Sequence, residues 1–440
     1  MPPKKLEAVE KFIIHGGNTV AGNLIPMGSK NEALPAIAAT LLACEPVTLR
    51  NVPEIRDCHV MFKVLKAMGA SVERPEDNTY IVDTRDVEDW RLPRDLCSRI
   101  RASILFAGPM LARKGRVELP PPGGDVIGRR RLDTHFDGMV ELGAKLTTGN
   151  TYFLEAQKLK GTDLFLDEAS VTATENLIMV ASRARGTTTI RNAACEPHVQ
   201  GLARLLNQMG AKIEGIGTNL LTIEGVTELG GADYTIGTDC LEVGSFIILA
   251  AVTGGELRVE RVCKEHMRVI LANLRRLGIR TWWEAEDVLV VPGDQELRVK
   301  YDLHGTIPQI DDAPWPQFPT DMMSMAIVAA TQAKGTVLFF EKMFEGRMFF
   351  VDNLISMGAQ IIMCDPHRVV VVGPSQLYGT SLESPDVRAG MALVTAALCG
   401  EGRSDIHNVR QIDRGYERID ERLRALGANI ERVQLTQEDR

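Results

Sequence analysis

The segment that decides the fold is IDERLRALGANIERV, residues Ile419–Val433, near the end of the chain. Its first eight residues place apolar side chains three and four positions apart, which is typical of an amphipathic helix. Gly427 follows, and a glycine after such a run commonly takes the left-handed conformation that ends a helix. The residues after it alternate between apolar and polar. The segment therefore predicts a helix, a glycine stop and a strand.

The same phrase occurs five more times, so the chain is built from repeats. A leucine or methionine, then a glycine, recurs at intervals of 67 to 80 residues, at Gly69, Gly143, Gly210, Gly278, Gly358 and Gly427. A second, almost wholly apolar run recurs in phase with it, as in EALPAIAATLLACEPVTL (32–49) and MMSMAIVAATQAKGTVLF (322–339). Such runs predict buried helices that lead through a turn into a strand. Each unit of about 70 residues thus supplies two helices and several strands.

Three units amount to about 210 residues, a size that one hydrophobic core can serve. Six units therefore predict an α/β protein with two similar domains and a cleft between them. The alternative is a linear stack of six repeats. It fits the sequence less well, because loops such as PPPGGDVIGRRRLD (120–133) are long and chemically distinctive.

The composition excludes several classes of protein. The 440 residues are 45% hydrophobic and 25% charged, which rules out disorder, and the net charge of -8 argues against nucleic acid as a partner. Eight cysteines show neither metal-ligand nor disulfide-scaffold spacing, so we expect reduced thiols, no metal and a cytoplasmic protein. No export signal and no uncharged stretch of the roughly 18–20 residues needed to span a membrane is visible. We expect a monomer or a weak homo-oligomer.

Common cofactor and hydrolase motifs are absent: the sequence has no GxGxxG after a strand, no GxxxxGK before Ser or Thr, no HExxH and no GxSxG. Helix starts carry partial positive charge and free amides, so a ring of them suits an anion. Polar residues lie at such starts or in the loops that face them, at Lys30, Asn31, Arg101, Thr172, Thr174, Asp239, Glu242, Asp321 and Arg388. Taken singly, each is better explained as a cap or a solvated ion pair.

Two segments stand out from the repeats. The loop LPPPGGDVIGRRRLD (119–133) combines prolines, a glycine pair, Asp125 and three arginines, so it could close over an anionic substrate and deliver a proton. A solubilising surface loop is the alternative. In IDDAPWPQFPTDMM (310–323), Asp321 directly precedes a buried helix, which suits a positioned base, whereas Asp311 and Asp312 are interpreted as turn residues.

Arginines also mark the junctions between the C-terminal units. Arg347, Arg388 and Arg414 occupy corresponding junctions, and three arginines in one cleft would bind a ligand with carboxylate and phosphate groups. The histidines show no metal-ligand spacing, and we interpret four of them as structural or capping residues, namely His59, His135, His198 and His266.

Six motifs in this order resemble the enolpyruvyl transferase family over essentially the whole chain: GSKNEALPAIAATLL, RASI, PPGGDVIGRRRLD, PWPQFPTDM, VRAGMALV and IDRGYERIDERLRALGANIERV. Asn31 and Glu32 after the GSK opening favour the branch that uses UDP-N-acetylglucosamine over the branch that uses shikimate 3-phosphate. The resemblance implies a two-domain inside-out α/β barrel with three repeats per domain. It places 1–28 and 239–440 in an upper domain, and 29–238 in a catalytic domain with a mobile loop at 119–133.

The resemblance also implies a reaction. The enolpyruvyl group of phosphoenolpyruvate would pass to the 3-hydroxyl of UDP-N-acetylglucosamine by addition and elimination, with release of phosphate and without a metal or cofactor, as the first committed step of peptidoglycan synthesis. An alkene carbon gains a proton and a hydroxyl loses one, so an acid and a base are needed.

Individual roles follow from the same resemblance. It implies catalytic roles for Lys30, Asp125, Arg130, Asp321 and Arg414, with Asp321 as the base. It implies that the substrates are bound by Lys30, Asn31, Arg101, Arg130, Arg131, Leu132, Asp133, Ser170, Val171, Thr172, Asp321, Met343, Arg347, Arg388 and Arg414.

Three positions depart from the usual residues of the family. Asp125 stands where many members have the cysteine that fosfomycin alkylates, so we expect activity to survive and the drug to fail. The ordinary pKa of Asp is about 3.9, so Asp125 must be buried or paired to stay protonated near neutrality. Arg131 stands where proline is usual, and Glu168 where a lysine often assists the diphosphate. Both changes alter the contacts on the nucleotide side of the site.

Two alternatives therefore stay open. One is a related transferase that uses another nucleotide or sugar as acceptor. The other is a non-catalytic regulator that binds the nucleotide, against which Lys30, Asp321 and the arginines argue, because a binding module needs no positioned acid and base.

Overall fold

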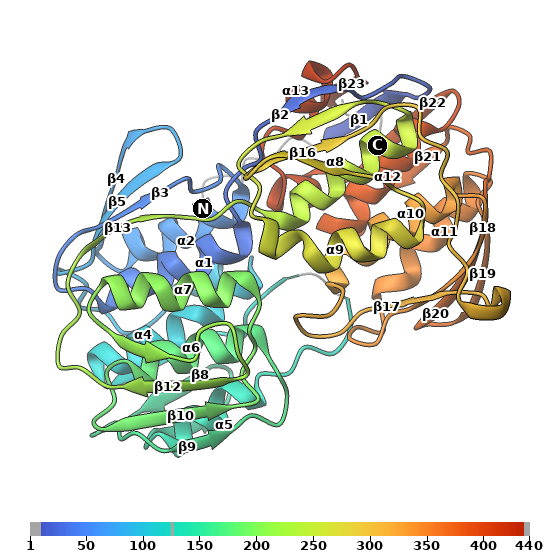
Figure 1. The fold of residues 1–440 in the computed structure, drawn as a ribbon. Helices are drawn as coiled ribbons and strands as arrows, with labels where there is room; N and C mark the ends of the chain where they lie inside the picture. The colour runs from blue at the N-terminus through green and yellow to red at the C-terminus, as the bar shows by residue number, and fades with distance from the viewer. Residues whose placement is uncertain (1–9, 125–126, 435–440) are drawn as a thin grey trace.

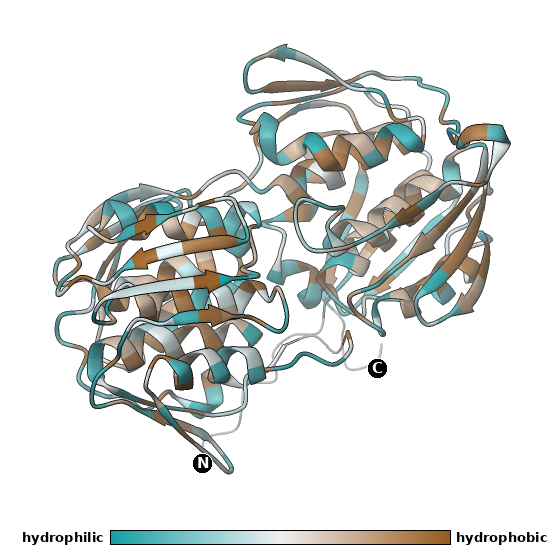
Figure 2. Cartoon of the chain, turned by 60° about the horizontal axis from the view of Figure 1, so that its bottom comes forward, coloured by the Kyte–Doolittle hydropathy of each residue, from teal (hydrophilic) through white to brown (hydrophobic). Residues whose placement is uncertain are grey.

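The computed structural model describes residues 10–124 and 127–434, which form a mixed α/β structure with two hydrophobic cores (Figure 1). The first core draws its residues from Met27 to Ile236, and the second joins Phe12–Leu24 to residues from Leu241 to Ile430. We call the two parts the first and second halves. Apolar residues occur in the helices and strands of both halves, while the connecting loops are largely hydrophilic (Figure 2). None of the described helices is both long and apolar enough to cross a bilayer.

The predicted sequence of helix, glycine and strand is found at all six places. The helices are α2 (Arg56–Ala67), α5 (Asp133–Glu141), α7 (Pro197–Gln208), α9 (Lys264–Arg276), α11 (Val351–Ser356) and α13 (Ile419–Ala425). The six glycines after them have φ between 87° and 107°, where any other residue is strained. The strands that follow are β4 (Ser71–Glu76), β7 (Lys145–Thr148), β11 (Lys212–Glu214), β15 (Trp282–Ala285), β19 (Gln360–Asp365) and β23 (Asn429–Gln434).

The apolar runs form a second set of helices, which are buried inside the two halves. They are α1 (Lys30–Ala39), α4 (Ala107–Lys114), α6 (Val171–Ala181), α8 (Cys240–Thr253), α10 (Met323–Gln332) and α12 (Val387–Cys399). Each leads into a strand as predicted: β3 (Val47–Arg50), β6 (Arg116–Leu119), β10 (Thr187–Arg191), β14 (Leu257–Val259), β18 (Gly335–Phe340) and β22 (Arg403–His407). In the first half α4 packs on α6, and in the second half α8, α10 and α12 pack on one another. Three of these helices carry a charged residue in their first turn, namely Lys30 in α1, Glu242 in α8 and Arg388 in α12.

Six sheets are present among the described residues, three in each half. The first half has the orders β13-β3-β5-β4, β6-β8-β7 and β11-β12-β10-β9, and the second half has β15-β16-β14-β2, β17-β18-β20-β19 and β21-β22-β1-β23. The strands not yet given bounds are β1 (Glu10–His15), β2 (Gly22–Leu24), β5 (Thr79–Asp83), β8 (Tyr152–Glu155), β9 (Asp163–Phe165), β12 (Leu220–Glu224), β13 (Ala232–Thr235), β16 (Val288–Val291), β17 (Gln309–Asp311), β20 (Arg368–Gly373) and β21 (Ser381–Glu383). A short helix, α3 (Arg94–Cys97), completes the set.

The N-terminal strands belong to the second half. β1 pairs antiparallel with both β22 and β23, and β2 pairs parallel with β14. In Figure 1, the blue strands β1 and β2 therefore lie among the yellow and red elements of the second half, whereas the other blue elements belong to the first half.

The chain crosses between the halves twice, and the two crossings lie side by side. The N–H of Ser29 donates to the carbonyl of Gly237 at 2.7 Å, and the N–H of Asp239 donates to the carbonyl of Met27 at 3.0 Å. The buried Glu242 accepts the N–H of Met27 at 2.7 Å and is paired with Arg422. This double connection places the start of α1 against the start of α8.

Candidate active site

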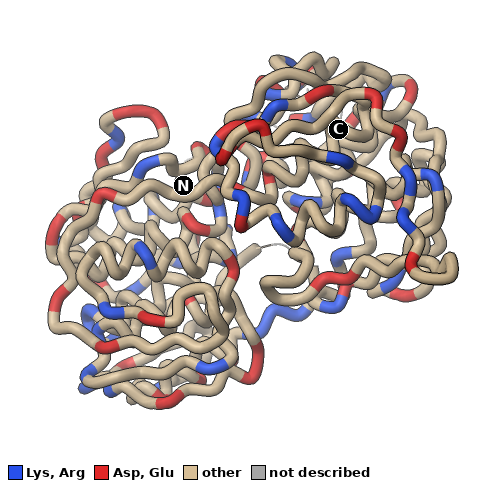
Figure 3. The backbone as a smooth tube through the Cα atoms, in the orientation of Figure 1, with Lys and Arg blue, Asp and Glu red and all other residues tan. Residues whose placement is uncertain are grey.

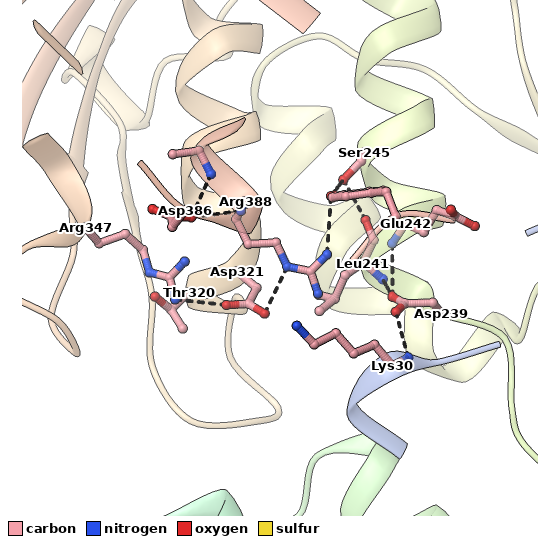
Figure 4. A network of polar contacts seen from close by, with 12 residues as sticks. Lys30, Asp239, Leu241, Glu242, Ser245, Thr320, Asp321, Arg347, Asp386 and Arg388 are labelled. Carbon is pink, nitrogen blue, oxygen red and sulfur yellow. Dashed lines mark hydrogen bonds and ion pairs between the residues drawn. The ribbon is translucent and has the colours of Figure 1, made fainter. Parts of the chain in front are cut away.

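The centre of the candidate site is the carboxylate of Asp321, which lies between two arginines (Figure 4). Arg347 donates from Nη2 to Oδ1 of Asp321 at 2.9 Å, and Arg388 donates from Nε to Oδ2 at 3.1 Å. Both arginine side chains are almost wholly buried. Burial raises the pKa of Asp321, but Arg388 and Arg347 outweigh this effect and hold the pKa well below its ordinary value. Asp321 is therefore ionised at neutral pH.

Local structure fixes each member of this group. Asp321 sits in a 3₁₀ turn (Thr320–Met322) that leads into α10, and Arg347 begins another (Arg347–Phe350). Arg388 lies in the first turn of α12, where Oδ1 of Asp386 accepts its N–H at 2.8 Å and caps the helix. Its Nη1 donates to the hydroxyl of Tyr416 at 3.2 Å. The guanidinium of Arg388 is thus held independently of Asp321.

A second charged group joins the two halves. The amine of Lys30, at the start of α1, lies 2.9 Å from Oδ2 of Asp57 in α2, and Nε of Arg414 donates to Oδ1 of Asp57 at 3.1 Å. Lys30 and Asp57 belong to the first half, whereas Arg414 comes from the second. Burial raises the pKa of Asp57, and the opposing charges of Lys30 and Arg414 lower it by more. Asp57 is therefore an ionised link between two predicted catalytic cations.

The two groups are close to each other. The charge of Lys30 also lowers the pKa of Asp321, and in Figure 4 the amine of Lys30 points toward Asp321 and Arg388. The backbone N–H of Lys30 donates to Oδ2 of Asp239 at 3.3 Å, while Oδ1 of Asp239 caps α8. The structure thus brings Lys30, Asp321, Arg347, Arg388 and Arg414 together.

The part of the 119–133 loop that follows Val126, which we call the basic loop, reaches the second half. The N–H of Gly346 donates to the carbonyl of Ile127 at 2.9 Å, and the N–H of Arg129 donates to Oε2 of Glu345 at 3.2 Å. Figure 3 shows the run of basic residues on the segment that lies between the two halves. Asp125, the predicted proton donor, lies outside the described residues.

Arg101 holds the backbone of this loop. Its Nη2 donates to the carbonyl of Arg130 at 2.8 Å and to that of Arg131 at 3.1 Å. Burial and the neighbouring charge of Arg130 lower the pKa of Arg101 to about 10. Two guanidiniums that repel each other in this way would be stabilised by an anion between them.

The predicted nucleotide residues gather at the start of α6. Ser170 is its N-cap residue, Val171 is its first residue, and the hydroxyl of Thr172 lies 3.1 Å from Nε2 of His135. Burial and the charge of Arg101 lower the pKa of His135 to about 3, so this histidine is neutral, which agrees with a structural role.

Arg131 and Glu168, the two unusual residues of this region, lie near each other. Nη1 of Arg131 lies 2.8 Å from Oδ2 of Asp167 and 4.0 Å from Oε2 of Glu168. Arg131 also donates from Nε to Asp133 at 3.3 Å. Arg131 therefore supplies a positive charge next to the position of Glu168.

The remaining predicted residues lie at the edges of the site. Asn31 is the second residue of α1, Leu132 packs against the first core, and Met343 lies in the turn after β18. The N–H of Met343 donates to Oε1 of Glu341 at 3.1 Å.

Sequence reasoning missed several carboxylates of the site. Asp57 lies in the first turn of α2, and Asp386 caps α12, and both positions carry the ordinary sequence signal of a helix start. Asp311 is the last residue of β17, so its interpretation as a turn residue is wrong. The same interpretation of Asp312 is wrong, because its side chain is fully buried and lies beside Glu341. The parallel pairing of β17 with β18 brings these two residues together, and no local pattern announces it.

No group of three or more His, Cys, Asp or Glu residues within 10–124 and 127–434 is arranged to hold a metal ion. The described polar atoms instead form a cluster of guanidiniums and one lysine around two ionised carboxylates. Such a cluster can bind a small polyanion and present a carboxylate to a hydroxyl group.

Comparison with known proteins agrees with this geometry. A family model described as EPSP synthase (3-phosphoshikimate 1-carboxyvinyltransferase) matches residues 14–423. The UDP-N-acetylglucosamine 1-carboxyvinyltransferase of Treponema denticola is 56% identical over 424 residues, which cover 96% of this chain and 99% of that protein. The protein of the same name from Bradyrhizobium diazoefficiens is 55% identical over 423 residues, which cover 96% of this chain and 98% of that protein.

Solved structures share the fold. The crystal structure of the enolpyruvyl transferase NikO from Streptomyces tendae has a TM-score of 0.86 at 25% identity and covers 98% of this chain and 100% of its own. EPSP synthase from Acinetobacter baumannii has a TM-score of 0.73 at 19% identity and covers 97% of this chain and 100% of its own. With a family model over most of its length and relatives more than half identical, the chain belongs to the enolpyruvyl transferase family.

Proposed function

We propose that the protein transfers the enolpyruvyl group of phosphoenolpyruvate to the 3-hydroxyl of UDP-N-acetylglucosamine and releases phosphate. The observation that carries this proposal is the carboxylate of Asp321, which two arginines keep ionised next to Lys30. The names of the relatives from Treponema denticola and Bradyrhizobium diazoefficiens support this acceptor over shikimate 3-phosphate.

The reaction divides into an addition and an elimination. In the addition, the acceptor oxygen bonds to C2 of phosphoenolpyruvate, Asp321 takes the hydroxyl proton, and Asp125 gives a proton to C3. In the elimination, the carboxylate of Asp125 takes a proton back from C3, the double bond re-forms, and the bond from C2 to the phosphate oxygen breaks. The departing phosphate takes the proton that Asp321 holds, so both carboxyl groups return to their starting states. Asp125 lies outside the described residues, so its role rests on the resemblance of the loop to the family.

The arginines adjust the strength of Asp321 as a base. In the free protein, Arg347 and Arg388 keep its pKa low, which makes it a weak base. The carboxylate and phosphate of phosphoenolpyruvate bring negative charge close to Arg388, Arg414 and Lys30, and this charge raises the pKa of Asp321. The base thus gains strength when the donor binds.

The nucleotide is proposed to bind at the start of α6. The amides of Val171 and Thr172 in the first turn of α6 suit the diphosphate, whereas the N–H of Ser170 donates to the carbonyl of Glu168 at 2.7 Å. Arg131 adds a positive charge there. Arg131 is paired with Asp167, so the diphosphate has to compete with that carboxylate. We propose that Arg131 compensates for Glu168, where a lysine is common in the family.

We propose that the two halves are the catalytic and upper domains, residues 29–238 and residues 1–28 with 239–440. In each, three sheets would surround the buried helices as an inside-out barrel. The two separate cores and the three sheets of each half support this division. The cytoplasmic location and the monomeric or weakly associated state remain predictions.

Phosphate release tests the proposed function. We expect the purified protein to release phosphate from phosphoenolpyruvate when UDP-N-acetylglucosamine is present, and not when it is omitted. Release with another nucleotide or sugar alone would assign a different acceptor. Binding of UDP-N-acetylglucosamine without any release would indicate the regulator.

Asp125 gives a prediction about inhibition. Fosfomycin reacts with a thiolate, so we expect full activity after incubation of the protein with fosfomycin. The Asp125→Cys variant supplies the thiol at the same position and should lose activity with time in the drug. Cys97→Ser is the matched control, since it removes a buried thiol near the loop and should leave the response of the wild type unchanged. Time-dependent inactivation of the wild type would contradict the prediction.

A further inference from the structure

Two buried carboxyl groups lie behind Arg347. β17 and β18 are parallel neighbours in which Asp311 is opposite Phe340. The next residue on each strand is acidic, so the pairing places Asp312 beside Glu341 at the carboxyl ends of the two strands. Both side chains are 0% exposed.

The hydrogen bonds of this pair leave one oxygen without a donor. Oδ1 of Asp312 accepts the N–H of Lys342 at 2.6 Å, but Oδ2 is buried and, within the described structure, accepts no hydrogen bond. Oε1 of Glu341 accepts the N–H groups of Met343 and Phe344 at 3.1 and 3.0 Å. Two buried carboxylates that lie side by side repel each other unless a proton lies between them.

Arg347 is the cation nearest to the pair. Its Nε lies 3.9 Å from Oε2 of Glu341, too far for a hydrogen bond, while its Nη2 bonds Asp321. Arg347 and Arg388 share the single negative charge of Asp321, and Lys30 adds a further positive charge near it. A pair that carries one proton places one negative charge behind Arg347, whereas a fully ionised pair places two buried negative charges there.

We propose that Asp312 and Glu341 share one proton, and that this dyad is a positioning device that keeps Arg347 on Asp321. The inference rests on the proposed function, in which Asp321 is the base. When the dyad loses its proton, a second negative charge appears beside Arg347 and draws the guanidinium from Asp321 toward Glu341.

The electrostatics of Glu341 support the shared proton. Burial and the neighbouring Asp312 raise the pKa of Glu341 to about 8, against the opposing charge of Arg347. The other charged groups near the two carboxyl groups contact atoms outside these carboxyl groups. The amine of Lys342 pairs with Asp311, and Nδ1 of His367 contacts the backbone carbonyl of Glu341.

The dyad also holds the turn that meets the basic loop. Glu341 binds the N–H groups of Met343 and Phe344, and the same turn carries Glu345, which accepts the N–H of Arg129. A change in the charge of Glu341 therefore acts on Arg347 and on this contact together.

The pH profile of kcat tests the dyad. In the wild type we expect kcat to fall as the pH rises through the ionisation of the dyad. Glu341→Gln and Asp312→Asn each keep one negative charge and remove the shared proton. Each variant should therefore lose this fall in kcat at high pH, the alkaline limb of the profile, while its kcat at pH 7 stays within about threefold of the wild-type value. The double variant removes the remaining charge, and its kcat at pH 7 should fall by about 10- to 100-fold, far more than the product of the single effects.

Asp311→Asn is the matched control. Asp311 precedes Asp312 in the chain but is partly exposed and pairs with Lys342. We expect its alkaline limb to match that of the wild type. An unchanged limb in both dyad variants, or single variants as impaired as the double variant, would overturn the proposal.

A spectroscopic readout separates the dyad from the proposed function. The infrared difference between the ligand-free wild type and either single variant should show a protonated carboxyl band that disappears between neutral and alkaline pH. Taking this difference removes the bands of other protonated carboxyl groups, such as the buried Glu175. If this band titrates but no phosphate is released with UDP-N-acetylglucosamine, the proposed function fails and the dyad stands. If turnover is normal and the band is absent, the dyad fails. Thermal unfolding of each variant shows whether it has folded.

Discussion

Asp321→Ala should abolish turnover without loss of the sugar nucleotide. The variant lacks the carboxylate that takes the hydroxyl proton, and positioned bases contribute about 100- to 10,000-fold to the rate. We therefore expect kcat to fall by at least about 1,000-fold. The Kd of UDP-N-acetylglucosamine should change little, because its proposed contacts lie at Ser170–Thr172 and Arg131. Isothermal titration and single-turnover phosphate release would measure the two quantities separately.

Replacing Asp321 also affects the two arginines that its carboxylate holds. Alanine leaves the buried guanidiniums of Arg347 and Arg388 without their shared carboxylate, and breaking a buried ion pair commonly costs ~3–5 kcal/mol of stability. Asp321→Asn keeps the volume and the acceptor oxygen, so it should fold and still be inactive. Asp311→Asn removes a carboxylate of the same segment and should stay active. Full activity of a folded Asp321→Asn variant would refute the role of base.

Lys30→Ala should be the next most damaging change. Its amine is one of the cations near Asp321, and it neutralises Asp57 together with Arg414. Without it, the phosphate of the donor loses a charge-assisted contact in a buried site, and removal of one such stabilising group commonly lowers kcat by about 100- to 1,000-fold. We also expect a higher KM for phosphoenolpyruvate. Steady-state kinetics at several donor concentrations would give both values.

Two further variants make the Lys30 result specific. Lys30→Arg keeps the positive charge and should recover part of the activity, although a guanidinium does not match the geometry of the amine. Lys63→Ala removes an exposed lysine of α2 and should behave as the wild type. If Lys30→Ala were folded and fully active, the donor would have to bind elsewhere.

Much of the fold could be predicted because its signals are local. A helix that ends at a glycine and continues as a strand needs only neighbouring residues, and Gly69 and Gly427 illustrate this at opposite ends of the chain. The pairing of strands far apart in sequence has no such signal. β1 pairs with β22 and β23, about 390 to 420 residues later, and the choice depends on which apolar faces the two cores bury.

The residues of the candidate site divide in the same way, into those with a local sequence signal and those whose role depends on distant parts of the chain. Asp321 and its arginines could be identified because each stands at the start of an apolar helix or at a junction between units. Asp57 could not, since its role comes from Lys30 and Arg414 meeting it from different halves. Asp312 was misread for a similar reason, because only the register of β17 with β18 sets it beside Glu341.

The double crossing of the chain has a consequence for movement. Ser29 bonds Gly237, and Lys30 follows directly, with its N–H on Asp239 of the opposite half. In a rotation, points near the axis travel least and distant points travel most. If one half turns about this pair of connections, Lys30 stays almost stationary, while groups farther from the connections, such as Arg129, move through longer arcs. The lysine then acts as the fixed reference to which the remaining groups are delivered.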